Sequence, residues 1–131
     1  MRFNLDCARA LLLALESDLQ FDDDLEYPAL SFWDVCDTPT MSAYSKADIY
    51  YTTLKLDEAG FIDVAIEDSG DRPSEIIYSS ITFDGHQYLD SVRSENLWEQ
   101  IKHKISIFGG SVALPIINSL SASIIKSQLG L

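Results

Sequence analysis

The fold is decided by residues 45–62, which read Ser-Lys-Ala-Asp-Ile-Tyr-Tyr-Thr-Thr-Leu-Lys-Leu-Asp-Glu-Ala-Gly-Phe-Ile. Ser45 is suited to accept a hydrogen bond from a free backbone N–H of a first helical turn. Ile49 and Leu56 fall on one helical face, and Gly60 permits the left-handed conformation that ends a helix. Apolar residues alternate after the glycine, so the pattern changes there from helix to strand.

The elements around this stretch follow from the same patterns. They are, in order, a helix after Asn4, a short strand within Leu25–Trp33, the Ser45 helix, a strand from Ile62 to Ile66, a return strand from Ser74 to Ile81, a helix from Phe83 to about Val92, a helix after Ser94 and a last helix from Ser111 or Leu114. Residues 34–44 read as a loop with no convincing helix.

This order predicts an α+β fold of winged-helix type, with a helix, a short strand, a helix and a β-ribbon wing followed by C-terminal helices. We expect a winged-helix domain over residues 1–93 and a C-terminal helical extension over residues 94–131, packed on it or used for oligomerisation. The residues expected to be buried together are Leu12, Leu15, Leu56, Ile62, Ile81, Leu89 and Trp98.

The chain of 131 residues carries 21 acids against 9 bases, a net charge of −12. Such a balance repels nucleic acid and anionic membranes at long range and favours basic protein partners. Its two cysteines, Cys7 and Cys36, match no zinc spacing and are too few for a disulfide framework. No signal peptide and no stretch able to span a bilayer is found, so we expect a cytoplasmic protein without membrane contact.

Acidic residues are concentrated between Glu16 and Asp37, and no lysine or arginine lies between Arg9 and Lys46. The run Asp22-Asp23-Asp24 concentrates oxygen ligands that a hard cation such as Ca²⁺ could use. The EF-hand pattern of alternating acids, a central glycine and a closing glutamate is absent. We therefore expect a solvated acidic loop without metal or cofactor.

Catalysis is disfavoured by the histidines and by the lack of motifs. His86 falls in the first turn of a helix near Asp84 and Asp90, so a histidine–carboxylate couple is conceivable. No motif ties a serine or cysteine nucleophile to it, and His103 lies between two lysines on a solvent face. Neither a Walker motif nor a dinucleotide fingerprint is found. We expect a protein that is not an enzyme and has no catalytic residue.

Two motifs carry a resemblance to a known family. They comprise Leu56, Glu58, Ala59, Gly60 and Ile62 in the first, and Ile81, Thr82, Gly85, His86, Leu89 and Asp90 in the second. On these residues the chain resembles an uncharacterised bacterial and prophage-borne winged-helix family of unknown function. A more distant likeness of fold reaches regulators of the PadR and MarR type. The resemblance implies a winged helix and brings no activity, because a fold alone does not fix a function.

The surfaces that a winged helix would offer to DNA are both acidic on balance. They are the recognition-helix face, with Lys46, Tyr50, Tyr51 and Lys55, and the wing tip, with Asp68, Asp71 and Arg72. Residues 45–59 hold two bases against three acids, and the wing tip one base against two acids. Because phosphate affinity comes mainly from lysine and arginine, we favour a regulatory module that binds another protein. A DNA-binding transcriptional regulator and an acidic mimic of nucleic acid remain the alternatives.

The last helix is more apolar than one narrow stripe requires. Its large aliphatic residues are Ile116, Ile117, Leu120, Ile124 and Ile125. One face can cover the core, and the remainder predicts an exposed patch that would join two copies of the chain. The alternative is a helix that is wholly buried within one copy.

Overall fold

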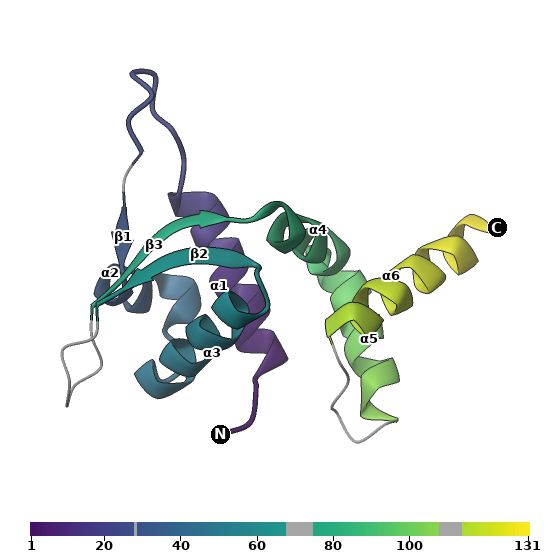
Figure 1. Cartoon of the computed structure of the whole chain (residues 1–131). Coiled ribbons are helices and arrows are strands. Elements are labelled where there is room, and N and C mark those ends of the chain that lie inside the picture. Colours follow the sequence, from purple (N-terminus) through teal and green to yellow (C-terminus); the bar gives the residue numbers. More distant parts are fainter. Residues whose placement is uncertain (28, 68–74, 108–113) are drawn as a thin grey trace. The chain divides into compact units, whose positions relative to one another are not determined.

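The structure is a computed structural model, and it describes residues 1–27, 29–67, 75–107 and 114–131 (Figure 1). Its elements are α1 (Leu5–Asp18), β1 (Leu30–Ser31), α2 (Phe32–Cys36), the 3-10 turn η1 (Pro39–Met41), α3 (Lys46–Glu58), β2 (Ile62–Ile66), β3 (Ile76–Ile81), α4 (Phe83–Val92), α5 (Glu95–Ser106) and α6 (Leu114–Leu129). The expected α+β class is confirmed. The described residues form two compact units, Met1–His86 and Gln87–Leu131. The domain boundary expected after residue 93 stays a prediction.

The first unit is built on a small antiparallel sheet with the strand order β1-β3-β2. The ribbon pairs Ile62 with Ile81 at one end and Ile66 with Ile76 at the other. Helix α1 packs against α3 and β3, and α3 also contacts β2 (Figure 1). Five residues expected in the core are buried here, namely Leu12, Leu15, Leu56, Ile62 and Ile81.

The expected helix starts are confirmed. Asn4 accepts a hydrogen bond from the Cys7 N–H, and Ser45 and Ser94 make the corresponding bonds at α3 and α5. Gly60 has a φ of 77°, the left-handed conformation expected after α3. Each of these features depends on a side chain and a backbone group only a few residues apart, which is why the sequence alone predicts it.

The short strand predicted within Leu25–Trp33 is confirmed as β1, which consists of Leu30 and Ser31. It ends there because of a complete capping box, in which Ser31 accepts from the Asp34 N–H and Asp34 accepts from the Ser31 N–H. This reciprocal pair satisfies two backbone donors and starts α2 at Phe32. Trp33 is 56% exposed on that helix and does not anchor a strand to the core.

The second unit brings α5 and α6 together with the C-terminal part of α4. Trp98 on α5 is buried, as are Leu89 on α4 and Ile117 on α6. The Ser121 hydroxyl donates to the Ser91 carbonyl over 2.9 Å. Leu89 and Trp98 are therefore buried as expected, as members of this unit. In the described part of the chain, no helix combines the length and apolar character that crossing a membrane would need.

Candidate functional site

The motif residues Gly60, Thr82 and Gly85 fasten the end of α3 to the start of α4. The Thr82 hydroxyl donates to the Gly60 carbonyl and accepts from the Gly85 N–H, over 2.5 and 3.1 Å. The Thr82 N–H donates to the Phe61 carbonyl over 3.0 Å. A Cβ added at Gly85 would lie 2.0 Å from the same Phe61 oxygen, so only glycine allows this approach. These three motif residues therefore serve the fold.

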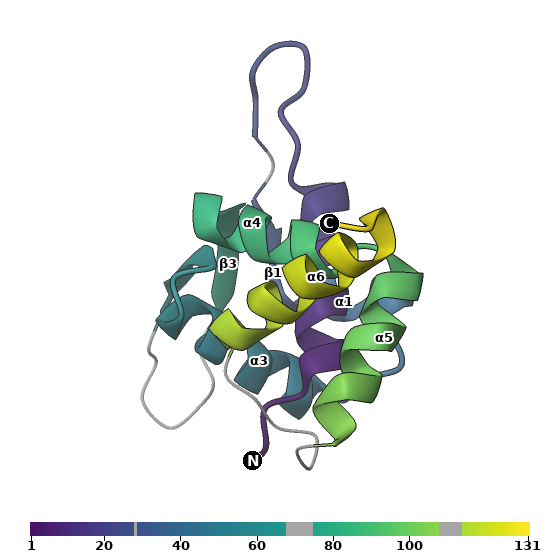
Figure 2. The same cartoon turned by 90° about the vertical axis from the view of Figure 1, so that its right-hand side faces the viewer.

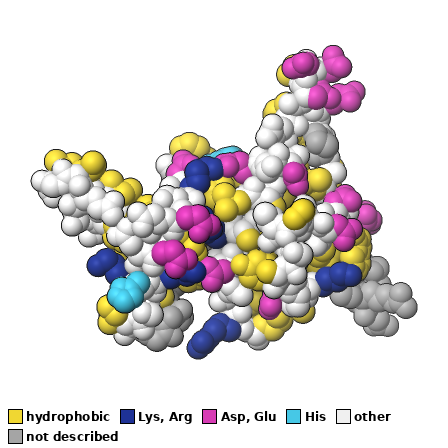
Figure 3. Space-filling model, turned by 180° about the vertical axis from the view of Figure 1, so that it is seen from behind, with side chains coloured by type: hydrophobic (Ala, Val, Ile, Leu, Met, Phe, Trp, Pro, Cys, Tyr) yellow, Lys and Arg dark blue, Asp and Glu magenta, His cyan; other side chains and the backbone are white. Residues whose placement is uncertain are grey.

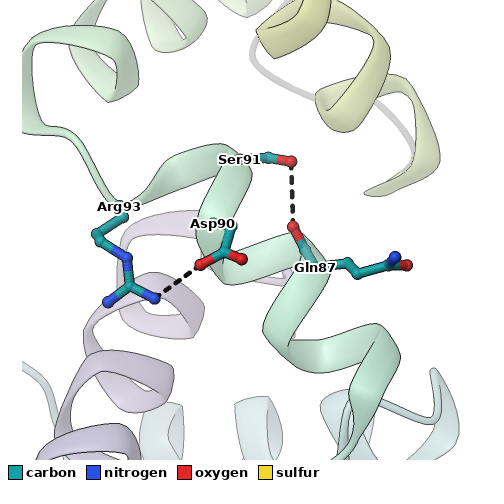
Figure 4. A network of polar contacts seen from close by, with 4 residues as sticks. All are labelled: Gln87, Asp90, Ser91 and Arg93. Carbon is teal, nitrogen blue, oxygen red and sulfur yellow. Dashed lines mark hydrogen bonds and ion pairs between the residues drawn. The ribbon is translucent and has the colours of Figure 1, made fainter.

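Other motif residues are also used structurally. Leu56, Ile62 and Leu89 are buried. Asp90 is exposed and forms an ion pair of 2.8 Å with Arg93 one turn along the chain (Figure 4). In the same figure the Ser91 hydroxyl donates to the Gln87 carbonyl over 3.2 Å. An exposed pair of this kind contributes at most about 1 kcal/mol, so we assign Asp90 to the surface of α4.

The recognition-helix face divides into two clusters. At the start of α3, the Lys46 ammonium lies 5.0 Å from the centre of the Trp33 ring. The Phe32 ring meets both Trp33 and Tyr50 edge to face, at 5.4 and 5.8 Å between ring centres. Sequence analysis missed Trp33 as a surface residue. The spacing Ser31-x-x-Asp34 is the signal that could have placed it on a helix.

The second cluster lies one turn further along α3. The Lys55 ammonium is 5.4 Å from the centre of the Tyr51 ring and 2.9 Å from a Glu58 carboxylate oxygen. The hydrogen bond that the Lys55 ammonium donates to the Glu58 carboxylate raises the pKa of Lys55. A lysine paired in this way has less attraction left for a phosphate, because a neighbouring carboxylate already offsets its charge. The wing-tip residues Asp68, Asp71 and Arg72 lie outside the described residues.

Residues 19–27, here called the acidic arm, project away from the sheet between α1 and β1 (Figures 1 and 2). The Asp22 carboxylate accepts from the backbone N–H groups of Asp24 and Glu26, each over 2.9 Å. The Leu25 N–H donates to the Asp22 carbonyl, and Leu25 takes a left-handed φ of 63°. Acidic side chains gather at the tip of the arm (Figure 3). Across the described residues, no three histidine, cysteine or acidic side chains are placed to hold a metal ion.

An open groove of about 500 Å³ lies at the base of the acidic arm. Its wall combines the apolar and aromatic residues Leu15, Leu19, Phe21, Tyr27 and Ile81 with the polar residues Glu16, Gln20, Ser80 and His86. A second hollow of about 410 Å³ adjoins it and shares Phe21 and Tyr27, whose ring centres are 4.8 Å apart. Partial burial raises the pKa of Tyr27. An apolar wall with a few polar groups suits the binding of a large side chain.

The motif residue His86 is exposed and contributes to this groove from the first turns of α4. The groove thus brings together residues from α1, the acidic arm, β3 and α4, which the sequence does not show as neighbours. Of the motif residues, Ile81 and His86 line this groove. Near the start of α3, Lys46 lies over Trp33 and Tyr50 packs against Phe32. Further along the helix, Lys55 lies over Tyr51.

On α6, the buried residues Ile117, Ser121 and Ile124 form one stripe. Ile116 and Ile125 are 49% and 43% exposed. At about 100° per residue, these two isoleucines flank the buried stripe on opposite sides. The exposed apolar surface of α6 is therefore divided between two flanks, with Leu120 partly buried near one of them.

Comparisons with known proteins agree with a family of unknown function. Residues 2–111 match the family described as hypothetical protein (DUF2513). An uncharacterized protein of Haemophilus influenzae is 28% identical over 129 residues, which cover 98% of this chain and 99% of that protein. No solved structure matches the chain. The family match includes both motifs and ends before α6 begins.

Proposed function

This chain belongs to the family described as hypothetical protein (DUF2513), and from that premise we propose that it is a cytoplasmic, non-enzymatic winged-helix module that regulates by binding another protein. The order α1, β1, α2, α3, β2, β3 supports the winged-helix assignment. In that assignment α3 is the recognition helix and the β2–β3 ribbon is the wing. The short strand β1 pairs antiparallel with β3, which is the third strand that a winged helix would have beside its wing.

The observation that carries the choice of a protein partner is the bond between Lys55 and Glu58. It occupies one of the two lysines that α3 could direct at phosphates. The other, Lys46, lies over the Trp33 ring. A chain with a net charge of −12 gains no compensating attraction for nucleic acid at long range.

A DNA-binding regulator is the second candidate, and the cluster of Trp33, Lys46 and Tyr50 favours it. An exposed aromatic ring beside an ammonium is a combination that also contacts bases and phosphates. The two candidates differ in their expected response to charge. Glu58→Gln frees Lys55, so it would strengthen DNA binding if α3 faced DNA.

Fluorescence anisotropy with a labelled mixed-sequence duplex at low salt separates these candidates. We expect no binding in the micromolar range for the wild-type chain or for Glu58→Gln. Trp33→Ser is the matched variant for the cluster of Trp33, Lys46 and Tyr50, and it should likewise show no binding to the duplex. Micromolar or tighter binding that weakens steeply with salt would contradict the proposal, because that slope counts phosphate contacts.

Capture from an extract of the source cell tests the protein partner directly. The full chain is immobilised, the extract is divided, and one half is treated with nuclease before mass spectrometry. We expect the same protein to be retained from both halves, and an unrelated protein of similar net charge not to retain it. Retention that disappears with nuclease would show that nucleic acid carried the contact.

We also propose that α6 joins two copies of the chain through its exposed isoleucines. Sedimentation of the wild-type chain should give a dimer at tens of micromolar, and Ile116→Ser with Ile125→Ser should give a monomer. Ser123→Ala, on the exposed part of the same helix, is the control and should stay dimeric. A monomeric wild-type chain overturns this part of the proposal, and so does a dimer that survives both serines.

A further inference from the structure

We propose that the acidic arm and the groove at its base bind a basic segment of a partner protein, in which lysine or arginine flanks a large apolar residue. This inference rests on the proposed function and deepens it, because it names the binding surface and the chemistry of the partner. It also moves the contact away from α3, the helix that a winged helix would use for DNA.

The first support is apolar. Phe21 and Leu25 on the arm are 68% and 78% exposed, although both are large side chains. Phe21 also lines both hollows at the base of the arm, together with Tyr27. Single exposed apolar residues are common, but an exposed aromatic ring that lines an open groove, with a second large apolar side chain on the same arm, marks an interaction surface. The groove of about 500 Å³ has room for one large side chain of a partner.

The second support is charge. The arm carries four acids, at residues 22, 23, 24 and 26, and the sequence has no lysine or arginine between Arg9 and Lys46. These acids alternate along the arm with its apolar residues, and acidic side chains are visible at its tip in Figure 3. A basic segment is drawn to such a surface and an acidic or phosphorylated one is repelled. The apolar residues of the groove and the acids of the arm together therefore select a partner that is both basic and apolar.

The third support is the order within the arm. Asp22 uses its carboxylate to hold the turn, so Asp23, Asp24 and Glu26 can present their charges outward. All three of these side chains are exposed. A surface that is already ordered loses less conformational entropy when it binds.

The test is selection from an unbiased library of displayed peptides against the full chain, followed by anisotropy with the selected peptides. We expect a consensus in which lysine or arginine flanks leucine, phenylalanine or another large apolar residue. The double variant Phe21→Ser with Leu25→Ser removes the two exposed apolar side chains of the arm. The double variant Asp23→Lys with Asp24→Lys reverses two of its negative charges. Each pair should weaken binding by about tenfold or more, and raised salt should weaken it as well.

Asp57→Lys with Glu67→Lys is the matched control, since it makes the same charge change at exposed positions outside the arm. It should change the affinity by no more than about twofold, the effect of a distant screened charge. Circular dichroism and the unfolding midpoint should be the same for all three pairs, because the altered residues lie outside the core.

The inference is overturned if no peptide is selected, if the consensus is acidic or lacks basic residues, or if binding survives both arm pairs. Residues 102–107 of this chain, Lys-His-Lys-Ile-Ser-Ile, are themselves basic and apolar. The inference is also overturned if the consensus matches them, since a second copy of the chain would then be the occupant. Capture from the source cell separates this failure from failure of the proposed function. If the two double variants of the arm retain the same partner protein as the wild-type chain does, this inference alone is overturned. If the partner is lost after nuclease treatment, the proposed function is overturned.

Discussion

The junction around Gly60 and the acidic arm both follow a helix of the first unit, and they use their residues in opposite ways. At the junction, Thr82 and Gly85 are engaged with the backbone of residues 60 and 61. On the arm, a single carboxylate, that of Asp22, holds the turn, and large apolar and acidic side chains around it face solvent. The motif residues at the junction therefore maintain the fold, whereas residues 19–27 of the arm belong to neither motif.

A left-handed residue in each of these two regions sharpens the comparison. Gly60 at the junction has a φ of 77° and Leu25 on the arm has a φ of 63°. Glycine takes this conformation without strain, whereas a residue with a side chain pays about 1 kcal/mol for it. The junction therefore has glycine at its left-handed position, which adds no backbone strain, whereas the arm has a leucine there despite the strain.

Gly85→Ala should give the largest effect at the junction. The added Cβ would lie 2.0 Å from the Phe61 carbonyl oxygen and 2.8 Å from a methyl group of Ile81, so the backbone must shift. We expect the free energy of unfolding in urea to fall by about 3 kcal/mol. Gln87→Ala, exposed on the same helix, is the control and should leave it nearly unchanged. An equally stable Gly85→Ala chain would contradict the close approach.

Thr82→Val should cost less, because it keeps the shape of the side chain and removes only the hydroxyl. The Gly60 carbonyl and the Gly85 N–H each lose a partner. We expect a loss of about 1–2 kcal/mol, the usual cost of a lost helix cap. Thr82→Ser restores the hydroxyl and should recover most of the stability in the same urea titration. If serine and valine are equally destabilising, the hydrogen bonds are not the cause.

Gly60→Ala should cost about 1 kcal/mol, since only the backbone conformation is affected. A Cβ at this position meets no atom within 4 Å, so no steric clash adds to the strain. Gly60→Asn should be less harmful, because asparagine tolerates the left-handed region better. Thermal unfolding followed by circular dichroism can rank the three chains. A cost as large as that of Gly85→Ala would show that the junction is more crowded than the structure indicates.

Leu25→Gly should have the smallest effect on stability, within about 0.5 kcal/mol of the wild type. Glycine relieves the left-handed strain but adds flexibility to the unfolded chain, and the two terms oppose each other. The same variant should bind the selected basic peptides more weakly, because an exposed apolar contact is lost. A large loss of stability would mean that Leu25 serves the fold, and the contrast with Gly60 would fail.

The parts of the fold that the sequence predicted well are local. The starts at Asn4, Ser45 and Ser94 and the end at Gly60 depend on contacts a few residues apart. The short strand within Leu25–Trp33 is confirmed, whereas residues 34–44 read as a loop and α2 continues to Cys36. The capping box of Ser31 and Asp34 begins that helix and overrides the strand preference of the aromatic residues beside it.

The candidate site was predicted less well, for a different reason. The motif pointed to His86 and to the junction, which the structure places at the start of α4 and between the end of α3 and that start. The groove was missed because its wall combines residues as distant in sequence as Leu15, Phe21 and Ile81. No local sequence pattern indicates that these residues are neighbours, because the packing of α1 against β3 brings them together.

Hydrogen exchange of the full chain, with and without a selected basic peptide, tests the central claim most directly. Without peptide, the Thr82 and Gly85 amides should exchange only through extensive unfolding, and the Asp24 and Glu26 amides of the arm should exchange much faster. With peptide, the arm should gain protection while residues 46–58 of α3 stay unchanged. Protection that appears on α3 and spares the arm would contradict the account, because α3 would then be the binding surface.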